Sequence, residues 1–356
     1  MDKFFRIVSG VSSVAGVLLL PVIVSAHEVY VLSGNSVVAD INKPPFDMIA
    51  VTLQNMHQFL FWGFIAAVVV VGIFLISIIR PLERKLDPML IRFKPYAPAV
   101  ARITVGAGFI AASYFQAAFG PELPLAASFG SFAPLVSLML AVIGTLLIIG
   151  FWARGAAVAA LLLFGISAYL HGWYLLTYTN YLGEIIVLLL IGSHRLSVHS
   201  VMGWDERFHR YFHFFSDRLK HLAFPILRIC FGVSLLYASL YAKVLHNNLA
   251  LQVASLPLAG HQYPLAHYFG FEPHFLVLGA AIIEIIAGMF FVLGIEIRFT
   301  SLFLLFWLSL SLWYFGESVW PHIILIGIPV AFIMHGYDKY SLEGRFFKKG
   351  NREPVF

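Results

Sequence analysis

The sequence contains very little cysteine and little charge. Cys230 is its one cysteine in 356 residues, which excludes an internal disulfide, a CxxC redox pair and a metal site built from several cysteines. Charged residues make up 12% of the chain, against about 25% in soluble globular proteins. Hydrophobic residues make up 60%, and the mean hydropathy is +0.87. A soluble core would not need this much apolar surface, so the composition predicts an integral membrane protein.

Motifs of several soluble enzyme classes are also missing. The sequence shows no Ser-His-Asp set, no glycine-rich phosphate loop and no HExxH motif, which disfavours soluble-type hydrolase and nucleotide chemistry. The net charge is +5, but the basic residues do not cluster on a soluble face. We therefore expect the lipid bilayer, and no nucleic acid, as a partner.

The N-terminus has the pattern of a secretory signal peptide. Lys3 and Arg6 precede the apolar run "VAGVLLLPVIV", and the small residues "VSA" end at Ala26. An uncleaved anchor is the alternative, and both interpretations place His27 on the outer side. Apolar segments of about 20 residues, the length that crosses a bilayer, follow near 57–79, 97–118, 132–152, 155–173, 176–193, 222–245, 274–296, 299–316 and 320–336.

Basic residues between these segments lie almost entirely on one side. Lys43 alone falls in a predicted outer segment. By the positive-inside rule, this asymmetry predicts a multi-pass inner-membrane protein with its mature N-terminus outside and its C-terminus in the cytoplasm. We divide the chain into a signal peptide (1–26), an outer segment with the first span and a Pro-bounded cytoplasmic linker (27–95), a four-helix unit (96–200), an interfacial amphipathic helix (201–221), a second four-helix unit (222–345) and a cytoplasmic tail (346–356).

The two four-helix units repeat each other. The segment "ARITVGAGFIAASYF" (101–115) matches "LRICFGVSLLYASLY" (227–241). Further along, an ungapped register pairs Gly144 with Gly288, Gly150 with Gly294, Arg154 with Arg298, Gly183 with Gly327, Gly192 with Gly336 and Ser197 with Ser341. The second unit carries an insertion in its outer loop, within 246–273. The predicted fold is an all-α polytopic membrane protein with two parallel-oriented four-helix transmembrane bundles and one extra N-terminal span.

Three motifs of the second unit resemble those of DoxX-type membrane proteins: "RICFG", "EIIAGMFFVLGIEIR" and "GYDKYSLEG". The resemblance covers 97–199 and 222–345. It is better in the second unit, because the first has Leu140 where the family has Glu, and His199 at the acidic position. The resemblance implies four-helix membrane proteins, some of them associated with quinone-linked sulfur oxidation or with membrane redox complexes.

Five of the ionisable residues inside predicted spans form a candidate polar core: Arg102, Glu184, Arg228, Glu284 and Lys243. A carboxylate in apolar packing is costly unless it is paired or protonated. Their depths along the helices favour an Arg102–Glu184 pair and an Arg228–Glu284 pair, with Lys243 as the rival partner of Glu284. A proton-linked quinone or substrate site, a transport pathway and a static pair that only sets helix register are the open interpretations.

Histidines gather near the predicted outer surface. We take His27, His261, His267 and His274 as candidate metal ligands, because imidazole binds copper, zinc and haem iron; interfacial histidines without metal are the alternative. The spacings form no tight motif.

The sequence thus favours a membrane subunit of a quinone-linked redox system, of the sulfur-oxidising kind the resemblance suggests, working with a partner redox subunit. Quinone is the expected cofactor, with copper or haem as alternatives, and the chain offers no obvious electron carrier of its own. The alternative function is a non-catalytic membrane transporter or assembly scaffold that handles a metal ion through the outer-face histidines. Whether the protein is an enzyme stays open.

Overall fold

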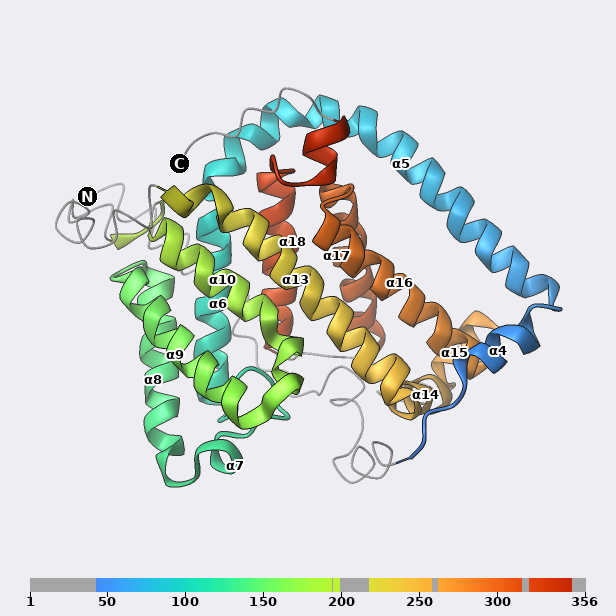
Figure 1. The fold of residues 1–356 in the computed structure, drawn as a ribbon, viewed down its shortest axis with the longest axis horizontal. Helices are drawn as coiled ribbons and strands as arrows, with labels where there is room; N and C mark the ends of the chain where they lie inside the picture. Colours follow the sequence, from blue (N-terminus) through green and yellow to red (C-terminus); the bar gives the residue numbers. More distant parts are fainter. Residues whose placement is uncertain (1–42, 194, 199–217, 258–261, 316–319, 348–356) are drawn as a thin grey trace.

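The computed structural model describes residues 43–193, 195–198, 218–257, 262–315 and 320–347, and these fold almost entirely into helices (Figure 1). The predicted signal peptide and most of the predicted interfacial helix lie outside the described residues. The α-helices are α4 (Met48–Asn55), α5 (Phe59–Phe93), α6 (Ala97–Tyr114), α7 (Leu125–Phe129), α8 (Ala133–Ile149), α9 (Ala153–His171), α10 (Thr179–Ile191), α13 (Ala223–Ser239), α14 (Asn247–Ser255), α15 (Leu265–Phe269), α16 (Pro273–Leu293), α17 (Ile297–Phe315) and α18 (Pro321–His335).

Helical stretches of membrane-spanning length dominate the described chain. Five are long and apolar enough to cross a bilayer: Leu125–Ile149, Ala153–Ile191, Lys220–Leu245, Pro273–Leu293 and Ile297–Tyr314. The helix α18 is a shorter apolar helix, and each apolar segment predicted from the sequence coincides with a helix. The prediction of an all-α, multi-pass membrane protein is confirmed.

The helix α5 is longer than the sequence predicts. It runs without interruption from Phe59 to Phe93 along one edge of the bundle (Figure 1), with Pro81 and Pro88 inside it. The predicted Pro-bounded linker after the first span is therefore helical over most of its length. A proline inside a helix costs about 3 kcal/mol because it lacks an N–H donor, but the Leu, Glu, Arg, Lys and Met residues around these two prolines are strong helix formers.

Within each predicted unit, the first two long helices cross at glycines. A Cβ atom added to Gly106 of α6 would lie 2.9 Å from the carbonyl oxygen of Gly144 in α8. At Gly232 of α13, an added Cβ would lie 2.7 Å from the carbonyl oxygen of Gly288 in α16. Only residues without a side chain allow membrane helices to approach so closely.

Between the units, the last helix of each packs on the first helix of the other. In α10, a Cβ at Gly183 would lie 2.9 Å from Cβ of Cys230 in α13. In α18, a Cβ at Gly327 would lie 2.4 Å from Cγ2 of Thr104 in α6. A duplication would produce such matched contacts, although the duplication itself stays a prediction.

Candidate functional site

A cavity of about 530 Å³ lies where α13, α14, α15, α16 and α17 meet α10, α18 and the 3-10 turns Gly172–Tyr178. Its lining is mostly apolar and aromatic. The polar side chains that line it, apart from tyrosines and tryptophans, belong to Thr177, Asn180, Ser234, Lys243, Glu284 and Ser311. A largely apolar cavity with a few polar groups is the usual form of a small-molecule site.

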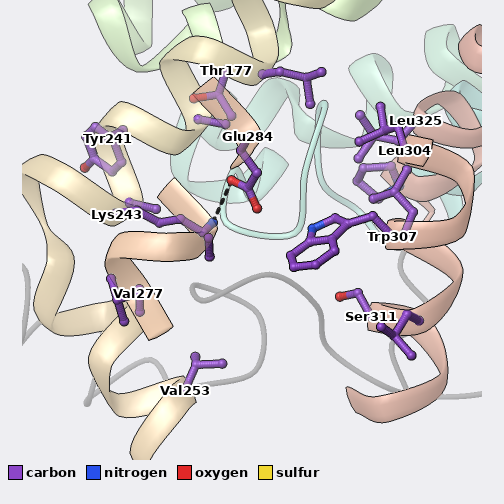
Figure 2. A pocket seen from close by; sticks show the side chains of 18 of the residues that line it. Thr177, Tyr241, Lys243, Val253, Val277, Glu284, Leu304, Trp307, Ser311 and Leu325 are labelled. Atoms are coloured by element: carbon purple, nitrogen blue, oxygen red, sulfur yellow. Dashed lines mark ion pairs between the residues drawn. The ribbon is translucent and has the colours of Figure 1, made fainter. Parts of the chain in front are cut away.

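Glu284 and Lys243 form an ion pair on the wall of this cavity (Figure 2). The distance between Lys243 Nζ and Glu284 Oε2 is 2.9 Å. The side chain of Glu284 is 19% exposed and that of Lys243 is 9% exposed, so the carboxylate is the more accessible of the two. Lys243 comes from π-helical turns, Leu240–Leu245, that extend α13, and π turns are frequent at functional sites.

The guanidinium of Arg228 has a different partner from the one the sequence favours. Its Nε donates to Oδ2 of Asp338 at 3.1 Å, and its Nη1 donates to the carbonyl oxygens of Phe291 and Val292 at the end of α16. The predicted Arg228–Glu284 pair is wrong, because the end of α16 leaves backbone acceptors unpaired and Arg228 caps them.

Arg102 lies at the matched position of the first unit. Its Nη2 donates to the carbonyl oxygen of Leu196, in the segment after α10, at 2.6 Å. Its guanidinium lies against Gly150, where an added Cβ would clash with Nη1. The predicted Arg102–Glu184 pair is therefore wrong as well. Arg228 caps the end of α16, Arg102 bonds the segment after α10, and neither lines the cavity.

Glu184 is fully buried between α10 and α6, away from the cavity. Its Oε1 accepts a hydrogen bond from Thr104 Oγ1 at 3.2 Å, and its Oε2 has no hydrogen-bond partner among the described residues. Of the five predicted polar-core residues, the structure brings together Lys243 and Glu284 alone.

Aromatic side chains complete the cavity wall. Trp307 and Ser311 of α17 lie across the cavity from the ion pair (Figure 2). Tyr174 and Tyr178, also in the lining, both donate to Oε1 of Glu122. Sequence reasoning missed these residues, since one aromatic residue in an apolar span carries no distinguishing signal.

The predicted metal ligands are only partly within the described chain. The ring of His267 stacks on Tyr263, with centroids 4.3 Å apart, and His274 Nδ1 lies 2.6 Å from Oε1 of Glu272. His27 and His261 lie outside the described residues. Within the described ranges no group of three or more His, Cys, Asp or Glu could hold a metal, so the metal site stays a prediction.

Comparison with known proteins identifies one family. The family model of DoxX matches residues 223–317, a stretch that runs from α13 through α17 and carries Lys243, Glu284 and Trp307. Neither a curated protein nor a solved structure matches the chain. Residues 223–317 are thus similar to DoxX, and the membrane-spanning helices make the chain a multi-pass membrane protein.

Proposed function

We propose that the chain is a membrane subunit of a quinone-linked redox system and that the cavity at Lys243 and Glu284 binds the quinone ring. The observation that carries this proposal is an ion pair on the wall of an otherwise apolar cavity, opposite an indole. Quinone rings are apolar, flat and bear two oxygens, so they need apolar walls and a few hydrogen-bonding groups. These residues supply both.

A second feature of the cavity supports a ligand. Oγ1 of Thr177 is buried in the lining and has no hydrogen-bond partner among the described residues. Buried polar atoms are nearly always hydrogen-bonded, so this hydroxyl would find its partner in a bound molecule. A scaffold whose ion pair only fixes packing has no need of such a cavity.

Each residue has a role in this proposal. Trp307 stacks on the ring, Lys243 donates to a ring oxygen, and Glu284 takes the proton of a ring hydroxyl and passes it on. A quinol supplies two electrons and two protons when it is oxidised. Glu284 would take one proton, the second would leave the other ring hydroxyl for water, and the electrons would go to a partner redox subunit. The topology predicted from the basic residues would put the cavity in the outer half of the inner membrane.

Extraction of the purified protein with organic solvent tests the proposal. We expect the wild-type protein to carry a quinone, detected by chromatography and ultraviolet absorbance, and the double variant Lys243→Ala/Glu284→Leu to have lost it. That variant copies the first unit, which has Ala117 and Leu140 at the matched positions. Glu184→Gln, a buried acid outside the cavity, is the matched control and should retain the quinone. Equal quinone content in all three proteins would contradict the proposal and leave a transporter or scaffold.

A further inference from the structure

One wall of the cavity comes from the outer loop of the second unit. The helices α14 and α15 lie in this loop, and they contribute Ala250, Val253, Ala254, Leu265 and Tyr268 to the lining. The helix α15 matches α7 of the first unit, whereas α14 belongs to the insertion. Both are short, and a helix this short is marginal without tertiary support. We call these two helices the cover.

The cover is fastened to the segment that precedes α4. The side chain of Asn247, at the start of α14, is fully buried and pairs with the backbone of Phe46 in both directions: Phe46 N–H donates to Oδ1 at 3.0 Å, and Nδ2 donates to the Phe46 carbonyl at 2.9 Å. Asn248 adds a bond from its Nδ2 to the carbonyl of Pro44 at 2.9 Å. These bonds join segments far apart in the chain. They hold the cover in place through residues that lie outside it.

Two residues of the cavity lining, one on the cover and one on α17, are exposed at the surface, and Tyr268 of the cover packs against Tyr314 of α17 with ring centroids 5.9 Å apart. Tyr268 of the cover and Trp313 of α17 both line the cavity, yet they are 54% and 76% exposed. Trp313 lies near the end of a membrane-spanning helix, and Trp and Tyr are enriched at the boundary between lipid and water. An opening at this position would lie at the boundary between lipid and water.

We propose that the cover is the gate of the cavity, held closed by Asn247, and that the ligand enters from the lipid between Tyr268 and Trp313. The ligand is therefore a molecule that dissolves in the membrane and carries an apolar tail. Its ring lies at the ion pair, and its tail lies in the opening. The identity of the ring rests on the proposed function, whereas the gate rests on the contacts of the cover alone.

Thiol labelling tests the gate without any ligand. In a Cys230→Ser background, Ser311→Cys places a thiol in the cavity lining, and its reaction with a small maleimide is timed in detergent. Loss of the paired hydrogen bonds in Asn247→Ala should raise the labelling rate about tenfold. The matched control is Asn55→Ala, because Asn55 is a buried asparagine bonded within α4 to the Val51 carbonyl. An Asn247→Ala protein that labels no faster than this control would overturn the gate.

Binding of two quinone analogues, one with a single isoprenoid tail and one without a tail, tests the ligand class. Wild type should bind the tailed analogue at least about tenfold more tightly, and Tyr268→Ala should remove most of that preference. Equal affinities of wild type for both would overturn the lipid route. Failure of either analogue to bind would count against the proposed function, and the labelling result would still decide the gate.

Discussion

Lys243 and Glu284 are a charged pair that the first unit lacks, since Ala117 and Leu140 stand at the matched positions. Breaking a buried pair leaves one charge without a partner, which costs up to about 3–5 kcal/mol, whereas apolar replacement of both is often neutral. We expect Lys243→Ala to lower the melting temperature in detergent markedly, and Lys243→Ala/Glu284→Leu to recover most of the loss. A double variant that melts at the same temperature as Lys243→Ala would contradict this expectation, because it would show that the fold requires the ion pair itself.

Gly150 and Gly294 have backbone conformations that other residues rarely adopt, with φ of +67° and +71°, and each lies against a buried arginine. An alanine there meets both strain and a clash, so Gly294→Ala should cost at least about 2 kcal/mol of unfolding free energy. Gly165→Ala is the control, because no atom lies within 4 Å of a Cβ at that position in α9. The thermal denaturation of the two variants should differ clearly, and similar curves would contradict this account of the arginine caps.

At the residue scale, the sequence predicted which ionisable groups are buried but not their partners. Depth along a helix follows from the rise per residue, while the direction in which a side chain points depends on helix packing. Arg228 and Glu284 were matched by depth, yet Arg228 turns to Asp338 and the end of α16. The motif "GYDKYSLEG" contains Asp338, so the partner of Arg228 could have been identified in that motif.

At the element scale, α5 shows how two prolines can mislead. They bound the predicted linker, but the helix continues past both. Replacing Pro81 with alanine restores an N–H donor and should slow amide exchange in the neighbouring turns of α5, as measured by hydrogen–deuterium exchange and mass spectrometry. An irregular linker would show fast exchange there before and after the substitution. The apolar spans were easier to predict, because about 20 apolar residues in a row have few alternatives to a membrane helix.

For the whole molecule, the cross-packing of α10 on α13 and of α18 on α6 ties the two units together. Two separately encoded halves, divided between α10 and α13, should therefore copurify from one membrane when only one carries a tag. Gly327→Leu should abolish this copurification, because a side chain at that position meets Thr104. Gly279→Leu is the control, since a Cβ at that position has only ordinary contact with Phe64 at 3.6 Å. Halves that never copurify would contradict the observed packing.

The central claim is that the cavity at Lys243 and Glu284 binds a quinone ring. Its direct test is an equilibrium titration of the protein in lipid nanodiscs with a quinone, in which binding is measured by the quenching of tryptophan fluorescence. Wild type should show saturable quenching that is reduced in Trp307→Phe, and Lys243→Ala/Glu284→Leu should bind at least about tenfold more weakly. If that double variant binds the quinone as tightly as the wild type, the charged pair in the cavity is not the ring-binding site.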